Sequence, residues 1–306
     1  MSRPGPFRLL VNPTAGAGRA RAVASALRDE LGARGADADI IEEADRAGTE
    51  RAARKSLDEG WRHLVAVGGD GTVQAVVNGM VADDQPVAED AVLGIVPAGH
   101  GGDYARTFGL SLPPKQAVGR LLDPTTMSAD LGVAETTNED GGTARRYFVN
   151  LAEVGYGAEV AHLASRLPRR LGRVRYLLAA WGAIRGVDRQ PTVVEIRHGQ
   201  QTVDLVDLVI AKGQFFGGGM RVAPRALPDS GRFNVLAFTG QRSQVFTLTP
   251  QLYRGGHLPH PEIREWQSPF VAVPEPAGRR VEADGELLGR TPARFSLLPG
   301  ILRISV

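Results

Sequence analysis

Short apolar runs alternate with amphipathic stretches over the first 130 residues of the chain. Four of these runs predict strands, at 7–11, 37–41, 63–67 and 92–96. Between them apolar residues recur at helical spacing, which predicts helices at 19–31, 49–59 and 72–80, the second with Thr49 as its N-cap. Continuous apolar strands that alternate with helices are typical of a parallel sheet covered on both faces. We therefore expect an α/β domain here.

The pattern changes near residue 130, where strand signals become alternating, closely spaced and separated by turn residues. They predict strands at 146–151, 192–197, 205–211, 232–238 and 270–273, and two short strands around Pro299 and Gly300. A single stretch, 172–185, has helical spacing. The expected organisation is an α/β domain at 1–130 and a mostly antiparallel β domain at 131–294. The last strand, about 295–306, is expected to return to the first domain.

Composition narrows the function classes. The chain has 306 residues, of which 42% are hydrophobic and 23% charged, as in a soluble globular protein. It has no cysteine, which excludes thiolate catalysis, disulfides and cysteine-ligated metals. A net charge of +2 does not favour nucleic acid as a partner. No apolar run is long enough to span a membrane, and the N-terminus lacks a signal-peptide pattern, so we expect a cytoplasmic protein.

Three glycine-rich turns follow predicted strands: Asn12 to Gly18, Gly68 to Thr72 and Pro97 to Asp103. Glycines allow the backbone to approach an anion closely, and the start of a helix favours negative charge. Asp70 in the second turn could hold Mg²⁺, accept a proton or cap the helix. Taken singly, this turn fits a plain tight turn equally well, and it lacks the Gly-Lys-Ser/Thr of a Walker loop. Three such turns at the carboxyl edge of one sheet favour a phosphate-binding site.

These turns, read as NPTAGAG, VAVGGDGTVQAVVNGM and IVPAGHGGDYAR, resemble the N-terminal motifs of the diacylglycerol kinase catalytic family. That family includes bacterial lipid kinases and sphingosine kinases. The second half carries further motifs in the same order: DLG, VNLAEVGYGAEV, FFGGGMRVAPRALPDSGRFNV and VEADGELLGRTP. The resemblance spans essentially the whole chain. It implies an ATP-binding α/β domain, a β-rich lipid-binding domain, and transfer of the ATP γ-phosphate to a lipid hydroxyl, with diacylglycerol as first choice.

The resemblance also implies roles for individual residues. The catalytic candidates are Asp70, Asp284 and Glu286, with Asp70 and Asp284 as the alternatives for the base. Mg²⁺ would be organised by Asp70, Asp103 and Asp130. ATP would contact the three turns, through Asn12, Pro13, Gly16, Gly68, Gly69, Gly71, Thr72, Gly99, His100 and Gly101.

Some positions depart from the family pattern. The third turn usually reads Gly-Thr-x-Asn-Asp, whereas this chain has His100 and Gly102 at the Thr and Asn positions. After GGDGT the family usually has Asn-Glu, here Gln74-Ala75, and its Asp-Asp-Gly is Asp229-Ser230-Gly231. The charged roles stay filled, while two of the changes alter the nucleotide pocket.

Residues 162–187 contain no acidic residue and interleave arginine with leucine, valine and tryptophan. A basic amphipathic helix of this kind can bind an anionic membrane surface, for which Arg170, Arg173 and Trp181 are the candidates. The alternative is a helix that packs its apolar stripe on the second domain and leaves its arginines in solvent. The expected partner is a lipid at the inner membrane surface, which makes the protein peripheral; homodimerisation stays open.

Three alternatives to a diacylglycerol kinase remain. A sphingoid-base kinase is the next choice, because sphingosine kinases belong to the family that the motifs resemble. NAD kinase shares the GGDGT turn but is disfavoured by the GGGM and DGE motifs. A non-catalytic nucleotide- or lipid-binding relative is disfavoured because all five carboxylates are retained.

Overall fold

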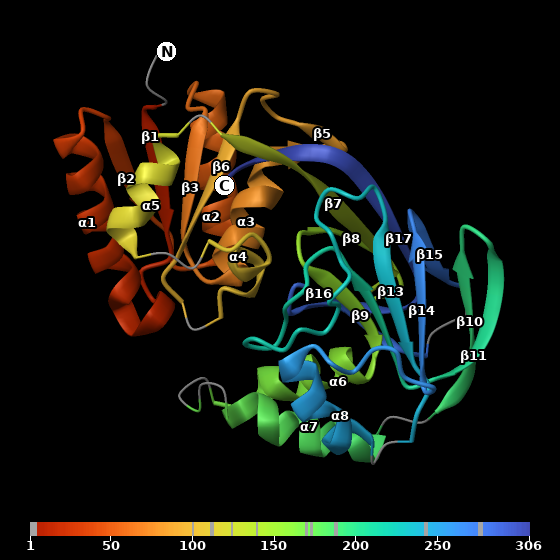
Figure 1. Cartoon of the computed structure of the whole chain (residues 1–306). Coiled ribbons are helices and arrows are strands. Elements are labelled where there is room, and N and C mark those ends of the chain that lie inside the picture. The colour runs from red at the N-terminus through yellow and green to blue at the C-terminus, as the bar shows by residue number, and fades with distance from the viewer. Residues whose placement is uncertain are drawn as a thin grey trace. The chain divides into compact units, whose positions relative to one another are not determined.

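A computed structural model describes residues 5–99, 101–110, 113–123, 125–138, 140–168, 171, 174–186, 189–241, 244–274 and 278–306. The chain forms two compact units (Figure 1). Unit 1 comprises Met1–Leu131, Gly217–Gly219 and Leu298–Val306. Unit 2 comprises Gly132–Phe216 and Met220–Leu297. Two strands, β7 (Thr126–Thr137) and β17 (Glu286–Ser305), run through the boundary between these segments.

Unit 1 is built from alternating strands and helices. In chain order they are β1 (Phe7–Val11), the 3-10 turn η1 (Ala15–Gly18), α1 (Arg19–Ala33), β2 (Ala38–Glu42), α2 (Arg46–Asp58), β3 (His63–Gly68), α3 (Asp70–Met80), β4 (Val81–Ala82), β5 (Gln85–Pro86), β6 (Val92–Pro97), α4 (Asp103–Thr107) and α5 (Pro114–Leu121).

The main sheet of unit 1 is parallel, in the order β2-β1-β3-β6 followed by the end of β17. Helices α1 and α5 cover one face, and α2 and α3 cover the other (Figure 1). The apolar core under α1 and α5 includes Leu9, Leu27, Val65, Val96 and Val118, all at most 1% exposed. Because β1 has β2 on one side and β3 on the other, the sheet changes winding direction between β1 and β3, where ligands of such sheets bind.

Unit 2 is mostly antiparallel. In chain order it contains β8 (Thr143–Phe148), β9 (Leu151–Gly155), α6 (Tyr156–Arg166), α7 (Val174–Gly186), β10 (Gln190–Ile196), β11 (Gly199–Leu205), β12 (Asp207–Ala211), β13 (Phe233–Phe238), α8 (Gln244–Arg254), β14 (Ile263–Ser268), β15 (Phe270–Val273) and β16 (Arg280–Ala283).

Two sets of strands in unit 2 pair with β17: β14-β13-β12-β9-β16 on one side and β11-β10-β15 on the other. Their shared core includes Phe148, Phe233 and Phe295, each fully buried. The rings of Phe148 and Phe233 are stacked at 5.7 Å between centroids. A parallel α/β unit and an antiparallel β unit confirm the predicted fold class.

Some elements differ from the sequence prediction. Helix α2 begins at Arg46 rather than near Thr49, because the Asp45 side chain accepts the Gly48 N–H at 2.7 Å and caps the helix. The hydroxyl of Thr49 instead donates to the Asp45 carbonyl. Helices α6 and α8 were not predicted. The two short strands expected around Pro299 are parts of one strand, β17.

Candidate active site

The turn after β1 is shaped by its own side chains. The Asn12 Oδ1 accepts hydrogen bonds from the N–H and the hydroxyl of Thr14, at 3.0 and 2.8 Å. Gly16 and Ala17 have left-handed backbone conformations, with φ of 60° and 58°. A Cβ added at Gly16 would lie 2.2 Å from the carbonyl oxygen of Ala98. This turn therefore packs directly on the turn after β6, and only glycine fits at residue 16.

The turns after β3 and β6 also meet backbone to backbone. The N–H groups of Ala98 and Gly99 donate to the Gly68 carbonyl at 2.8 and 3.2 Å. A Cβ added at Gly99 would lie 2.8 Å from the Gly69 Cα, and one at Gly68 would lie 2.2 Å from the Thr72 Oγ1. The structure thus brings the three predicted glycine turns together at the carboxyl edge of the parallel sheet.

Asp70, the first residue of α3, fixes the position of the third turn. Its carboxylate accepts the N–H groups of Gly102 and Tyr104, both at 2.9 Å. A Cβ added at Gly101 would lie 2.5 Å from the Asp70 Oδ2. Because Gly102, the N-cap of α4, has no side chain, Asp70 supplies the capping oxygens from a different helix. Asp70 therefore connects the starts of α3 and α4.

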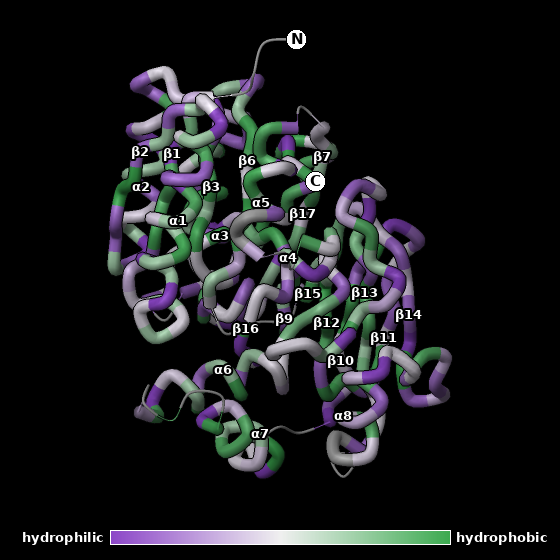
Figure 2. Tube along the Cα trace, turned by 60° about the vertical axis from the view of Figure 1, so that its left-hand side comes forward, coloured by the Kyte–Doolittle hydropathy of each residue, from purple (hydrophilic) through white to green (hydrophobic). Residues whose placement is uncertain are grey.

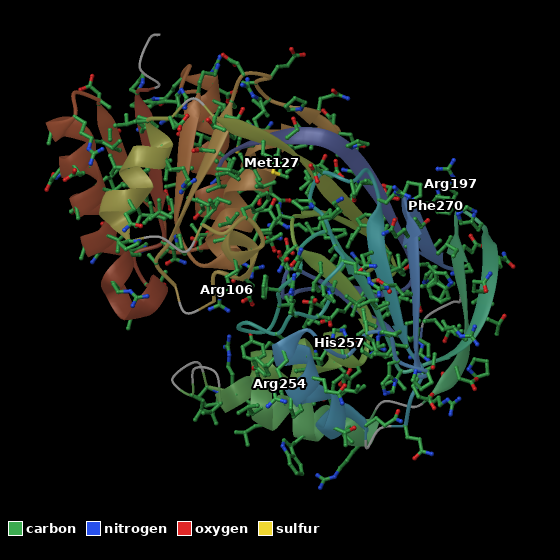
Figure 3. The ribbon with its side chains drawn as sticks, in the orientation of Figure 1. Arg106, Met127, Arg197, Arg254, His257 and Phe270 are labelled. Carbon is green, nitrogen blue, oxygen red and sulfur yellow. The ribbon has the colours of Figure 1, made fainter. Side chains whose placement is uncertain are left out.

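Asp103 binds the GGG motif from the second half of the sequence. Its Oδ2 accepts the N–H of Gly218 at 2.7 Å, and its Oδ1 accepts a bond from the Arg106 guanidinium at 3.3 Å. The Asp103 residue is only 4% exposed. Arg106, on α4 (Figure 3), lies against Gly219, where an added Cβ would come within 2.4 Å of its Nη1. Segment 217–219 belongs to unit 1 through these contacts.

Asp130 is the third aspartate predicted to organise Mg²⁺. It lies on β7, is 3% exposed, and accepts the N–H of Gly300 at 2.9 Å. Within the described residues there is no group of three or more His, Cys, Asp or Glu side chains that could hold a metal ion. Asp70, Asp103 and Asp130 all bind backbone N–H groups, and their metal role stays a prediction.

The DGE motif lies in unit 2. Asp284 adopts a left-handed conformation with φ of 48° and is 8% exposed. Its carboxylate accepts three consecutive backbone N–H groups: Val149 at 2.7 Å, Asn150 at 3.0 Å and Leu151 at 3.1 Å. Glu286 pairs with Arg146 at 3.2 Å. The turn before β9 is thus fixed by Asp284, and the catalytic roles of both acids stay predictions.

Helix α7 contains hydrophobic residues along its length (Figure 2), and several of its large apolar side chains are exposed. They are Val174 (52% exposed), Tyr176 (45%), Leu177 (62%), Leu178 (52%) and Trp181 (64%). Its small residues Ala179 and Ala183 are buried instead. Of the predicted site residues, His100, Arg170 and Arg173 lie outside the described residues. No helix in the described part of the chain is long and apolar enough to cross a membrane.

Sequence reasoning missed a cluster of buried acids in unit 2. Glu153 on β9, Asp207 on β12 and Glu282 on β16 are 7%, 7% and 0% exposed. Burial raises the pKa of Asp207 to about 7 and that of Glu282 to about 8, and it raises the pKa of Glu153 well above its usual value. The available signal was a charged residue inside an otherwise buried strand, as in LAEVG and RVEA.

Both units match known protein families. Residues 6–134 match the family described as "Diacylglycerol kinase catalytic domain". Residues 150–306 match "YegS C-terminal NAD kinase beta sandwich-like domain". The chain therefore belongs to the diacylglycerol kinase and YegS-like family of lipid kinases, which confirms the family resemblance, and it is an ATP-dependent lipid kinase.

Individual relatives align with this chain over most of their own length. A diacylglycerol kinase of Mycobacterium tuberculosis is 28% identical over 98% of this chain and 94% of its own. A protein of Pseudomonas syringae named "probable lipid kinase YegS-like" is 31% identical over 83% of this chain and 79% of its own.

Solved structures share the fold. A diacylglycerol kinase from Bacillus anthracis covers 98% of this chain and 96% of its own, with a TM-score of 0.71 and 17% identity. Yeast NADH kinase covers 98% of this chain and 82% of its own, with a TM-score of 0.51 and 10% identity.

Proposed function

We propose that this lipid kinase transfers the γ-phosphate of ATP to the hydroxyl of diacylglycerol and produces phosphatidic acid. The observation that carries the proposal is the convergence of three glycine turns where the parallel sheet of unit 1 changes winding direction. The relative from Mycobacterium tuberculosis, matched over nearly its whole length and named a diacylglycerol kinase, supports the choice of lipid.

The nucleotide phosphates would lie over the bare backbone of these turns. Gly69 and Gly99 are in backbone contact. Neither residue has a side chain, so neither covers the backbone of the other. Gly71 and Thr72, in the first turn of α3, add the favourable end of a helix dipole for an anion. Asn12, whose side-chain oxygen accepts a hydrogen bond within its own turn, would contact the nucleotide from the turn after β1. Phosphoryl transfer depends mostly on such positioning and charge neutralisation.

The acidic residues of these turns fit Mg²⁺ by donor type, since Mg²⁺ prefers oxygen ligands and commonly takes one or two carboxylates together with nucleotide phosphates and waters. Asp70, Asp103 and Asp130 would organise the ion directly or through water. The ion would neutralise charge that develops on the transferred phosphoryl group. The backbone N–H groups bound to Asp70 and Asp103 keep both carboxylates in fixed positions.

Asp70 and Asp284 remain the two candidates for the base that accepts the lipid hydroxyl proton. Each carboxylate is positioned by backbone N–H groups, two for Asp70 and three for Asp284. Such positioning matters because a general base must lie within hydrogen-bond reach of the proton that it accepts.

Unit 2 would reach its lipid by docking α7 on a membrane, which makes the protein peripheral at the inner membrane surface. Leu177, Leu178 and Trp181 are more than half exposed, although apolar side chains of this size are usually buried. Arg175 and Arg185 lie on the same helix, which has no acid. Apolar residues with basic neighbours suit an anionic lipid surface, where each basic residue adds about 1 kcal/mol.

The test of the reaction uses radiolabelled ATP with Mg²⁺ and a panel of diacylglycerol, sphingosine, ceramide and NAD⁺. We expect labelled phosphatidic acid as the main product. If labelled sphingosine phosphate predominates, the lipid substrate is sphingosine rather than diacylglycerol, and the reaction is still phosphate transfer to a lipid hydroxyl. Labelling of NAD⁺ without lipid would overturn the assignment. Binding of ATP without turnover of any lipid would favour a non-catalytic relative.

The test of docking is sedimentation with vesicles that contain phosphatidylglycerol. Leu177→Ser and Trp181→Ser should each weaken binding about tenfold, since burying one large apolar side chain is worth about 1.5–3 kcal/mol. Leu227→Ser, a matched control, removes an apolar side chain that is 54% exposed outside α7. Equal losses in the α7 variants and in the control would remove α7 from the docking surface.

A further inference from the structure

Two buried glutamates face each other in unit 2 on neighbouring strands. Glu153 on β9 and Glu282 on β16 are direct partners in the antiparallel register, so their side chains lie next to each other on one face of the sheet. Glu282 has no exposed surface. Within the described residues, no N–H or O–H donor of normal hydrogen-bond geometry reaches either of its oxygens. Two ionised carboxylates cannot satisfy each other, whereas one proton between them makes a donor and an acceptor.

The first turn of α6 packs on Glu153, one member of this pair. A Cβ added at Gly157 would lie 2.2 to 2.5 Å from the three carboxyl atoms of Glu153, so the helix backbone rests on the acid itself. The Gly157 N–H donates to the Oδ1 of Asp207 at 3.1 Å. The start of α6 therefore contacts the side chains of Glu153 and Asp207 directly.

The surrounding acids oppose ionisation of the pair. After burial, the carboxylate of Asp284 is the next cause that raises the pKa of Glu282. Asp207 and Glu282 both raise the pKa of Glu153. The Gly285 N–H partly offsets these effects on Glu282. A single negative charge is therefore tolerated in this interior much better than two.

Positive groups near the acids have other bonds. Arg279 lowers the pKa of Asp207, and its guanidinium also donates to the Leu205 carbonyl at 2.8 Å. Arg280 forms an ion pair at 2.7 Å with Glu159, in the first turn of α6. This ion pair holds α6 to β16 beside the buried acids.

We propose that Glu153 and Glu282 share one proton that keeps α6 seated, and that loss of this proton to water or buffer base loosens α6 and the α7 helix attached to it. The attachment is direct, since the Tyr156 hydroxyl at the start of α6 donates to the Ala180 carbonyl of α7 at 3.1 Å. The effect on membrane docking rests on the function proposed above for α7, whereas the shared proton does not.

The experiment follows hydrogen exchange of the α6 amides by mass spectrometry on the full chain, from about pH 6 to about pH 9. The exchange rates of the α3 amides serve as the reference that corrects for the intrinsic rise of amide exchange with pH. We expect protection of α6 to fall at least about tenfold as the pH rises. Glu282→Gln, which keeps a neutral donor and acceptor in place, should abolish this fall. Asp204→Asn, at an acid whose side chain is 50% exposed, should leave it unchanged.

A fall that persists in Glu282→Gln, or no fall in the unchanged protein, would overturn the proposal. Carbon-labelled glutamate in the unchanged protein gives a second measurement by NMR, should the variant not fold. One buried glutamate carboxyl must then titrate above neutral pH, and titration of all glutamates in the ordinary acid range would also overturn it. Neither measurement involves lipid turnover, so failure of the shared-proton proposal can be distinguished from failure of the proposed kinase reaction.

Discussion

Replacement of Asp70 by asparagine tests whether this carboxylate only holds the third glycine turn in place or also takes part in phosphate transfer. The carboxylate accepts two N–H groups at 2.9 Å, from Gly102 and Tyr104. Asparagine offers only one oxygen, so one of these charge-assisted bonds is lost, at a cost of about 1.5–3 kcal/mol. A general base contributes about 10²–10⁴-fold to the rate. We therefore expect a modest loss of stability and a fall of more than about 100-fold in phosphate transfer.

The assays are urea unfolding, transfer of labelled phosphate to diacylglycerol in mixed micelles, and binding of a non-hydrolysable ATP analogue. If Asp70 acts on the reacting groups, kcat falls and the analogue still binds. If it only anchors the turn, analogue affinity falls together with activity. Asp123→Asn is the matched control, because that carboxylate accepts the Thr125 N–H at 2.9 Å in an exposed turn. Transfer retained within a few-fold would refute a catalytic role for Asp70.

Two further predictions concern close packing and pH. Gly99→Ala forces a methyl group to within 2.8 Å of the Gly69 Cα, and it should lower the free energy of unfolding by about 1–3 kcal/mol and remove most of the ATP affinity. Gly119→Ala is the control: it has open space around it and should be neutral or stabilising in unfolding assays. The folded protein keeps Asp207 and Glu282 protonated up to a pKa of about 7 and about 8, while the unfolded chain releases both protons near the ordinary pKa values of 3.8 and 4.5. Between these limits the folded state binds more protons than the unfolded state, so the free energy of unfolding should fall as the pH rises. Glu282→Gln should remove the part of this fall that comes from Glu282. An unaltered slope in the variant would contradict the raised pKa of Glu282.

The sequence predicts the meeting of the three glycine turns better than the buried acids, for a physical reason. The turns after β1, β3 and β6 follow strands that are largely apolar, and parallel strands place their ends at one edge of the sheet. The pairing of Glu153 with Glu282 depends on which strands become neighbours, and 129 positions of chain separate the two. Local patterns carry no information on that pairing. The roles of Asp70 and Asp103 as anchors likewise depend on tertiary contacts.

The start of α6 shows a different limit. Strand β9 ends at Gly155, and α6 begins at the next residue, so no turn sequence separates them. Gly155 has φ of 121° and ψ of −122°, a conformation that favours glycine and reverses the chain in one step. An added Cβ there would lie 2.6 Å from the Val206 carbonyl oxygen. Where one residue replaces a loop, the hydrophobic pattern passes from period two to helical spacing without a visible boundary.

The family difference at Gly102 leads to a final prediction. The family usually has asparagine at this position, and Gly102 is left-handed with φ of 75°. Asparagine is among the few other residues that adopt this conformation readily, so exchange between the two preserves the turn. The capping oxygens of α4 come from Asp70 in either case. The substitution therefore removes a side-chain amide from the proposed nucleotide site without altering the backbone.

Gly102→Asn should then keep the fold, since its added Cβ meets only the Pro97 Cβ, at 3.3 Å. Gly102→Val should instead destabilise the protein, because a β-branched side chain strains a left-handed residue by about 1–3 kcal/mol. ATP affinity measured on the folded asparagine variant reports the contribution of the amide. A gain would show that the missing amide weakens nucleotide binding in this kinase. Loss of folding in the asparagine variant would contradict the left-handed turn on which the exchange depends.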